Sequence, residues 1–114
     1  MAHPRVLCLT DEPHLLRALR ERYAVDTAED GADALERLRR DPDGYAMVVA
    51  DAPATPLSVF LSEARRAAPA TAPIVLAGWA DTDAADHAVR SGLAFRALST
   101  PCSARDLLSA CAAA

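Results

Sequence analysis

Lysine is absent from this chain of 114 residues, and all twelve of its basic residues are arginine. The absence excludes any mechanism that needs a lysine ammonium group, because no other part of the chain supplies one. A formal net charge of −4 and the lack of a basic stripe argue against nucleic-acid binding. The tightest basic cluster is Arg37, Arg39 and Arg40. Because Asp41 and Asp43 follow it directly, we interpret this cluster as a solvated helix face.

Cysteine is scarce, and its placement excludes the common zinc sites. Cys8, Cys102 and Cys111 form no CxxC pair and have no histidine at metal-ligand spacing. An odd number of cysteines without a disulfide framework is typical of reduced thiols, so we expect a cytoplasmic protein. Cys8, which stands in an apolar run, is interpreted as a small buried side chain.

Long hydrophobic runs are also absent. No apolar run approaches the ~20 residues that span a bilayer, and the N-terminus lacks the apolar region of a signal peptide. We therefore expect no membrane partner. The length, together with a hydrophobic fraction of 52%, predicts one domain over residues 1–114 with a single packed core.

Short apolar runs alternate with segments that have helical periodicity. The runs predict strands at Arg5–Leu9, Ala24–Ala28, Tyr45–Ala50, Pro73–Ala77 and Leu93–Ser99. The signals that predict helix starts are Pro13 after Asp11 or Glu12, Asp30, Thr55 with Pro56, Asp81 or Thr82, and Ser103 with Asp106. The first helix is expected to carry Leu15, Leu16, Leu19 and Tyr23 on its apolar face. This alternation predicts an α/β protein with a parallel sheet covered on both faces.

Right-handed crossovers restrict such a chain to a doubly wound sheet. With five strands it is a flavodoxin-like (βα)₅ fold with strand order 2-1-3-4-5. The first and third strands are then neighbours, so the carboxylates of Asp11 and Asp51 are expected to lie close together at one sheet edge. Such a pair can bind a hard cation such as Mg²⁺, or one of them can take up a phosphoryl group as a nucleophile. Both can instead cap the following segments, which suits Asp11 better than Asp51 because a helix follows Asp11 directly.

Four segments in the right order carry a family resemblance. They are Leu7–Pro13 (Leu-Cys-Leu-Thr-Asp-Glu-Pro), Met47–Asp51 (Met-Val-Val-Ala-Asp), Ile74–Asp81 (Ile-Val-Leu-Ala-Gly-Trp-Ala-Asp) and Leu98–Pro101 (Leu-Ser-Thr-Pro). Over essentially its whole length the chain resembles the receiver domains of response regulators in two-component signalling.

The resemblance implies a phosphorelay role for the site. Asp51 stands at the phosphoacceptor position, and Asp11, Asp51 and the backbone carbonyl of Pro53 would hold Mg²⁺. The metal would neutralise charge while the carboxylate attacks an incoming phosphoryl group in line. A sensor histidine kinase or another signalling protein is the implied partner.

The chain departs from the family pattern at four positions. Thr10 replaces one of two acids in the first turn, which is expected to weaken Mg²⁺ binding. Ala77 replaces a serine or threonine, Thr100 replaces a lysine, and Ala97 replaces an aromatic residue. Arg96 and Arg105 are the remaining cations near that end of the chain, and neither stands at the lysine's position.

These departures lead to two hypotheses. The first is an atypical receiver that accepts phosphate at Asp51 but has impaired phosphorylation or switching. The second is a pseudo-receiver, a protein-interaction module that acts without phosphorylation. An enzyme is not expected: an aspartate phosphatase needs a second acid at the position of Pro53, and a dinucleotide enzyme needs a glycine-rich first turn.

The expected partner surface comprises the fourth helix, the fifth strand and the fifth helix. It includes His87, Arg90, Arg96, Ala97 and Arg105. The small side chain of Ala97 suggests a fixed docking face, and homodimerisation through the same surface is a further hypothesis. All three histidines, His3, His14 and His87, are interpreted as solvated.

Overall fold

The computed structural model describes residues 4–10, 12–51 and 57–114, in which strands and helices alternate. The strands are β1 (Arg5–Cys8), β2 (Ala24–Thr27), β3 (Met47–Asp51), β4 (Ala72–Ala77) and β5 (Arg96–Ser99). The α-helices are α1 (Pro13–Arg20), α2 (Gly31–Arg40), α3 (Leu57–Ala67), α4 (Thr82–Arg90) and α5 (Ala104–Ala113), and a 3₁₀ turn, η1, spans Trp79–Asp81.

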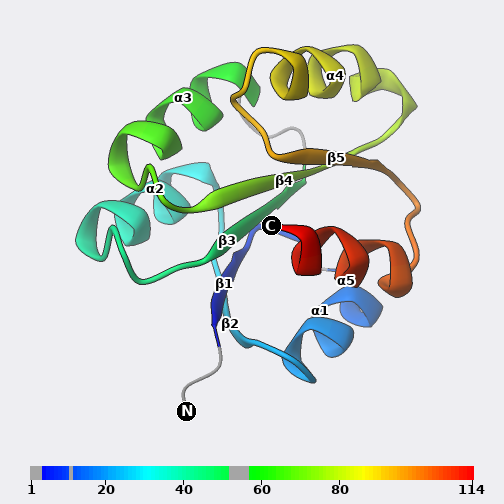
Figure 1. Ribbon diagram of the computed structural model, residues 1–114, viewed down its shortest axis with the longest axis horizontal. Coiled ribbons are helices and arrows are strands. Elements are labelled where there is room, and N and C mark those ends of the chain that lie inside the picture. The colour runs from blue at the N-terminus through cyan, green and yellow to red at the C-terminus, as the bar shows by residue number, and fades with distance from the viewer. Residues whose placement is uncertain (1–3, 11, 52–56) are drawn as a thin grey trace.

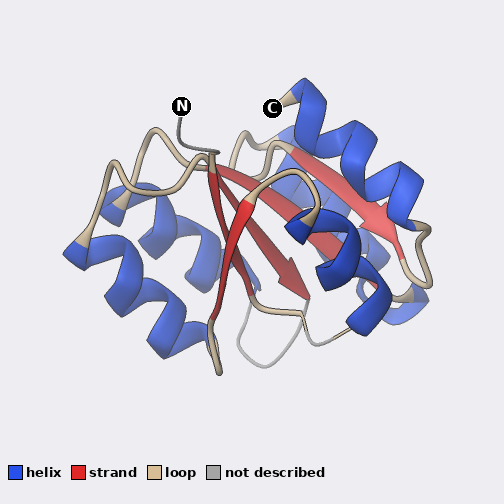
Figure 2. Ribbon diagram, turned by 90° about the horizontal axis from the view of Figure 1, so that it is seen from below, coloured by secondary structure: helices blue, strands red, loops and turns tan. Residues whose placement is uncertain are grey.

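All the strand pairs are parallel, and the order is β2-β1-β3-β4-β5, which confirms the predicted fold class. Helices cover both faces of the twisted sheet: α2, α3 and α4 lie on one side, and α1 and α5 on the other (Figures 1 and 2). None of the helices in the described ranges is long and apolar enough to cross a membrane.

Two apolar layers, one on each face of the sheet, form the core. The layer under α2, α3 and α4 includes the fully buried Leu7, Leu38, Val48, Leu61 and Val75. The layer under α1 and α5 includes the fully buried Val6, Cys8, Leu15, Val49, Ile74 and Leu107. Successive residues of a strand point to opposite faces, so a strand buried on both sides must be apolar throughout. This requirement explains why the three inner strands, β1, β3 and β4, read as largely apolar runs in the sequence.

Cys8 has the structural role that was predicted for it. Its side chain is fully buried in the layer under α1 and α5. Burial, with a smaller contribution from Cys111, raises the pKa of its thiol to about 12. Cys8 is therefore a neutral apolar side chain at physiological pH.

Helix capping follows the sequence signals at two of the predicted starts. The Asp30 side chain accepts a hydrogen bond from the backbone N–H of Asp33 at 2.8 Å, and the Ser103 hydroxyl accepts one from Asp106 N–H at 3.1 Å. Asp81 is the N-cap of α4 but forms no side-chain cap, and Glu12 likewise makes none at α1. The predicted cap at Thr55 and Pro56 lies outside the described residues.

Several predicted boundaries were wrong. The fifth strand begins at Arg96 rather than Leu93, because the N–H groups of Leu93 and Ala94 bond to the carbonyl of Ala88 and close α4. Gly92 makes this closure possible with a φ of 83°, a backbone conformation that side chains disfavour.

The observed bounds of the first helix and the third strand also differ from the predicted ones. Helix α1 ends at Arg20, so Tyr23 lies in the following turn, although it still packs against the layer under α1 and α5. Strand β3 begins at Met47 rather than Tyr45 and has Asp51 as its last residue, one position further than expected. The turn η1 was not predicted at all.

A polar cluster, formed by Arg5, Asp26, Asp41 and Tyr45, fastens the amino-terminal part of β1 to β2 and α2. Arg5 donates to Asp26 Oδ2 at 2.7 Å and to Asp41 Oδ2 at 3.0 Å, and the Tyr45 hydroxyl donates to Asp26 Oδ2 at 2.7 Å. The guanidinium carbon of Arg5 also lies 4.5 Å from the centre of the Tyr45 ring. Hydrogen bonds from Tyr45 and Arg5 lower the pKa of Asp26.

Replacing Leu61 by alanine is expected to lower the free energy of unfolding by about 2–5 kcal/mol, because it leaves a cavity beneath α3. Chemical denaturation measures the change. Val59→Ala is the matched control: Val59 lies on the same helix with 55% of its surface exposed. A comparable loss in both variants would contradict the assignment of the α3 face that is buried.

Asp26→Asn is expected to lower the free energy of unfolding near neutral pH by less than about 1 kcal/mol, since the Asp26 side chain is 38% exposed. A lowered pKa stabilises the fold above the ordinary pKa of the carboxyl group, and this contribution disappears as the pH falls through the folded-state value. Urea unfolding at neutral and strongly acidic pH measures the difference, which should vanish in acid. Asp83→Asn, at an exposed position of α4, is the control.

Candidate functional site

The carboxyl-terminal edge of the sheet collects the residues that the sequence singled out. Asp51 ends β3 and is half-buried, between the neighbouring strands β1 and β4. In the strand register Asp51 lies opposite Leu76, one residue before the end of β4. Asp11 and Pro53 lie outside the described residues, so the expected proximity of Asp11 to Asp51 stays a prediction.

Thr10 follows β1 at this edge and is 4% exposed. Its hydroxyl oxygen accepts a hydrogen bond from the backbone N–H of Glu12 at 3.3 Å, directly before α1. This is a local turn contact, in which a side-chain hydroxyl satisfies one backbone donor. Thr10 therefore supplies a neutral oxygen that already accepts a hydrogen bond. The family pattern has a carboxylate at this position.

Ala77 and Thr100 meet at the ends of β4 and β5. Ala77 is 3% exposed, and its carbonyl accepts a hydrogen bond from Thr100 N–H at 2.9 Å. The Thr100 hydroxyl lies 3.7 Å from the point where a Cβ atom on Gly78 would stand. The peptide bond that follows, between Thr100 and Pro101, is cis. The two positions at which the family has a hydroxyl and an ammonium group thus adjoin each other, and here they carry a methyl and a neutral hydroxyl.

A small cavity lies beside this corner of the edge. Its volume is about 40 Å³, and it is lined by Ala77, Thr82, Ala85, Asp86, Ala97, Leu98 and Ser99. Ala77 and Ala97 therefore line the same cavity, and both side chains are smaller than those that the family pattern has at these positions. Spacing alone gave no sign of this, because their common cavity depends on how β4, β5 and α4 pack together.

Two further residues at the edge have contacts that the sequence did not predict. His14 is exposed, in line with its interpretation as solvated, and its Nε2 also lies 3.2 Å from the Cys102 carbonyl oxygen, which links α1 to the segment before α5. Cys102 itself is buried. Burial, and then the carboxylates of Asp106 and Asp51, raise the pKa of its thiol. The Asp51 carboxylate therefore contributes to the raised pKa of the Cys102 thiol.

The described residues do not include a preformed cluster of magnesium ligands. No group of three or more His, Cys, Asp or Glu side chains that could hold a metal occurs among residues 4–10, 12–51 and 57–114. Mg²⁺ requires near-octahedral oxygen coordination, usually through one or two carboxylates. Of the two predicted acidic ligands, Asp51 lies in the described part of the chain, and the Thr10 hydroxyl at the end of β1 is neutral. The described donors do not make up a magnesium site by themselves.

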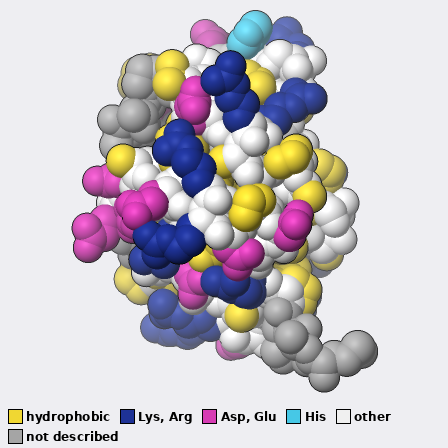
Figure 3. Space-filling model, turned by 90° about the vertical axis from the view of Figure 1, so that its left-hand side faces the viewer, with side chains coloured by type: hydrophobic (Ala, Val, Ile, Leu, Met, Phe, Trp, Pro, Cys, Tyr) yellow, Lys and Arg dark blue, Asp and Glu magenta, His cyan; other side chains and the backbone are white. Residues whose placement is uncertain are grey.

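The face that carries α2 and α3 has mixed charges (Figure 3). Arg37, Arg39 and Arg40 pair with Asp33, Glu63 and Glu36, at 3.3, 3.3 and 2.6 Å respectively. The arginine cluster is thus neutralised by neighbouring acids, which confirms its interpretation as a solvated helix face.

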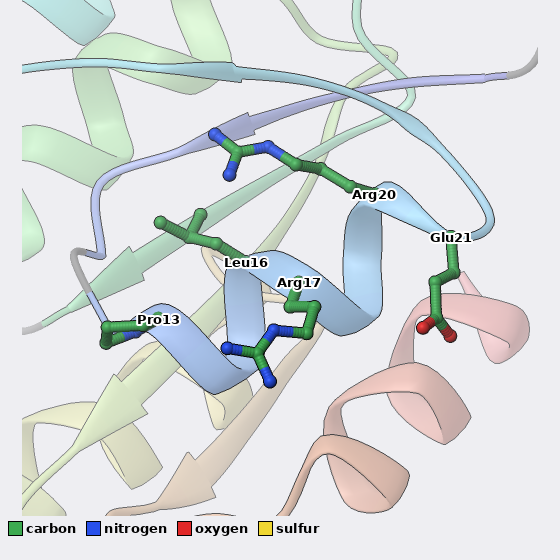
Figure 4. Close-up of a pocket in the computed structure, with 5 residues that line it drawn as sticks. All are labelled: Pro13, Leu16, Arg17, Arg20 and Glu21. Carbon is green, nitrogen blue, oxygen red and sulfur yellow. The ribbon is translucent and has the colours of Figure 1, made fainter.

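A shallow groove of about 530 Å³ runs over α1 and is lined by Pro13, Leu16, Arg17, Arg20 and Glu21. In Figure 4 the guanidinium groups of Arg17 and Arg20 extend on either side of Leu16. Opposite charges and two apolar residues, Pro13 and Leu16, share this open surface. The groove therefore indicates no particular chemistry.

Comparisons with known proteins fit this geometry. The chain is similar to the crystal structure of a response regulator receiver domain protein from Clostridium thermocellum, with a TM-score of 0.84 and 27% identity over 96% of this chain and 92% of that one. This chain has the receiver-domain fold of response regulators. The receiver domain is also similar to a structure described as adenylate cyclase from Rhodopirellula baltica, with a TM-score of 0.86 and 28% identity over 97% of this chain and 86% of that one.

A CheY-like receiver domain protein from Methanospirillum hungatei JF-1 has the same fold at 22% identity and a TM-score of 0.78, over 95% of this chain and 90% of that one. No protein-family model and no curated protein matches the sequence. The three-dimensional structure thus shows the similarity to receiver domains that the sequence motifs predict.

Asp51→Asn is expected to speed alkylation of Cys102, because removing the neighbouring carboxylate lowers the pKa of the thiol and increases its thiolate fraction. Labelling by iodoacetamide, followed by mass spectrometry of the Cys102 peptide, measures the rate. Asp106→Asn should act in the same direction, and Asp43→Asn, on the loop after α2, is the control. Equal rates in all four proteins would contradict the electrostatic link between Asp51 and Cys102.

Proposed function

We propose that this receiver domain serves two-component signalling with Asp51 at the phosphoacceptor position, and that its phosphorylation or its response to phosphorylation is impaired. One observation carries the proposal: the corner beside Asp51 is built from Ala77, Ala97 and Thr100, so it holds no ammonium group, no aromatic ring and no hydroxyl at Ala77. Its partner is a sensor histidine kinase or another signalling protein in the cytoplasm, and it performs no catalysis of its own.

The charge of the modified site supports impairment. A phosphoryl group adds about −1.5 to −2 charge and three strong acceptor oxygens, which require charged donors. A hydrogen bond to a charged group contributes about 1.5–3 kcal/mol, roughly twice as much as one between neutral groups. Thr100 offers one neutral hydroxyl where the family has an ammonium group, and the chain contains no lysine.

Arg96 is poorly placed to compensate. It begins β5 opposite Ile74, whereas Ser99 at the end of the strand lies opposite Ala77. At about 3.3 Å per residue, the Arg96 backbone lies ~10 Å from the carboxyl end of the strand. Its guanidinium carbon lies 5.3 Å from the centre of the Phe95 ring, on the preceding residue. We infer that Arg96 serves the outer surface of β5 and not a phosphoryl group on Asp51.

A pseudo-receiver that binds its partner without phosphorylation is the second candidate. The Thr10 hydroxyl, where an acid would help to bind Mg²⁺, is already used by the Glu12 N–H. Any Mg²⁺ binding through Asp11, Asp51 and the carbonyl of Pro53 would accordingly be weak. This candidate differs from the first in whether Asp51 ever takes up phosphate.

Incubation with acetyl phosphate and Mg²⁺ tests both candidates, with intact mass as the first readout and Asp51→Asn as the control. The fluorescence of Trp79 is the second readout, because this one tryptophan begins η1, one residue after Gly78 and the end of β4, and is 91% exposed. An impaired receiver gives a sparse adduct on the wild type alone and no change in fluorescence. The pseudo-receiver gives no adduct.

A gain-of-function variant sharpens the test. Thr10→Asp combined with Ala77→Thr and Thr100→Lys returns one acid, one hydroxyl and one ammonium group to the edge. We expect this triple variant to raise the adduct yield at least about tenfold, since ~1.4 kcal/mol suffices for that factor. A wild-type protein that is phosphorylated as fully as the triple variant, with a matching fluorescence change, would overturn the proposal of impairment.

A further inference from the structure

A groove of about 490 Å³ lies between α1 and the carboxyl ends of β1 and β2, at the end of the strand order opposite β5. Its apolar lining comes from Leu9, Leu16 and Ala28, which are all partly buried. In open α/β sheets ligands bind outside the carboxyl ends of the strands, and small-molecule pockets have volumes of about 300–1,000 Å³. The place and the size of this groove therefore suit a small ligand.

Thr10 brings an unused hydrogen-bond donor to the lining of the groove. It is 4% exposed, and its hydroxyl oxygen accepts a hydrogen bond from the Glu12 N–H at 3.3 Å. Within the part of the chain that the structure describes, its hydroxyl hydrogen donates to no acceptor. A hydroxyl can donate as well as accept, and a nearly buried donor without an acceptor is costly. An acceptor oxygen on a ligand in the groove would remove that cost.

Arg20 and Glu29 supply the charges of the groove, one positive and one negative. They form no ion pair with each other or with any other residue of the described ranges, in contrast to the paired arginines of α2. A guanidinium group binds a carboxylate through two parallel hydrogen bonds, and a carboxylate binds an ammonium group. Opposite charges that line one groove without meeting are therefore suited to a ligand that carries both a carboxylate and an ammonium group.

The Arg20 side chain extends toward the strands. In Figure 4 both Arg20 and Leu16 point from α1 toward the sheet. Burial and then Cys111 raise the pKa of the Cys8 thiol, and the charge of Arg20 lowers it. Because Cys8 is the last residue of β1, this effect places the guanidinium group near the carboxyl end of that strand, where Thr10 follows.

We propose that the groove between α1, β1 and β2 binds a free α-amino acid with an apolar side chain. The carboxylate of the ligand pairs with Arg20 and accepts from the Thr10 hydroxyl, its ammonium group pairs with Glu29, and its side chain packs on the apolar lining. The proposal goes beyond the function given above, because this ligand binds without phosphorylation, at the same sheet edge as Asp51. A nucleic acid is disfavoured as the occupant, since it requires several cations.

Titration of the isotope-labelled 114-residue protein with L-leucine, followed through its amide NMR signals, tests the proposal. We expect saturable shifts of the signals of Leu9, Thr10, Arg20 and Glu29, and none in α4 or β5. Isocaproate has the leucine skeleton without the ammonium group, and isoamylamine has it without the carboxylate. Each should bind at least about tenfold more weakly than L-leucine, because it leaves one charge of the groove without a partner.

Charge-removing variants locate the ligand. Arg20→Gln and Glu29→Gln should each weaken L-leucine binding at least about tenfold, since each removes one of the two charges. The matched controls are Arg17→Gln and Glu21→Gln, which line the separate groove over α1 and should leave the affinity unchanged. Thr10→Val should weaken binding, whereas Thr10→Ser keeps the hydroxyl and should bind like the wild type. Circular dichroism confirms that every variant is folded.

Three results would overturn the proposal. The first is the absence of any saturable shift with L-leucine at millimolar concentrations. The second is isocaproate or isoamylamine binding as tightly as L-leucine, which would mean that one charge suffices. The third is an equal loss of affinity in Arg17→Gln and Arg20→Gln, which would place the ligand outside this groove. None of these measurements uses phosphate, so their failure is distinguishable from failure of the acetyl phosphate experiment.

Discussion

Parallel pairing of the strands is the constraint on which the rest of this structure depends. Because all five strands run in one direction, their carboxyl ends arrive at a single edge of the sheet. The register then places Asp51 opposite Leu76, and the Thr100 N–H reaches the Ala77 carbonyl. Residues that are about 25 positions apart in the chain become neighbours through backbone hydrogen bonding alone. Side chains at the edge therefore do not have to support the sheet.

Because side chains at the edge do not hold the strands together, polar groups can be absent from the edge while the fold stays stable. Both faces of the sheet are apolar and covered by helices, so most of the stabilisation comes from burial. Thr10 is satisfied by the Glu12 N–H, and Ala77 contributes a carbonyl that any residue would supply. Neither replacement leaves a buried polar group without a partner, which would be costly. The receiver-domain fold is consequently compatible with neutral side chains at Thr10 and Ala77.

The fold was largely predictable, because apolar runs, caps and breakers report local structure directly. The fifth strand shows where such patterns fail: Leu93 and Ala94 look like strand residues, but their amides close α4 at the Ala88 carbonyl. An apolar pattern cannot distinguish a strand from a buried turn that leads into it. The positions of the edge residues followed from strand order, whereas the cavity common to Ala77 and Ala97 did not. Such a space depends on how two strands and a helix pack, which is a property of three-dimensional contact.

The two outermost strands of the sheet have one more property in common. On β2 the partly buried Asp26 is held by Arg5 and Tyr45, and on β5 the exposed Arg96 is the first residue. A strand from another molecule that added to either side would have to bring its own backbone alongside a fixed charge and displace the water around it. Both open sides of the sheet thus resist the strand-by-strand growth that leads to aggregation.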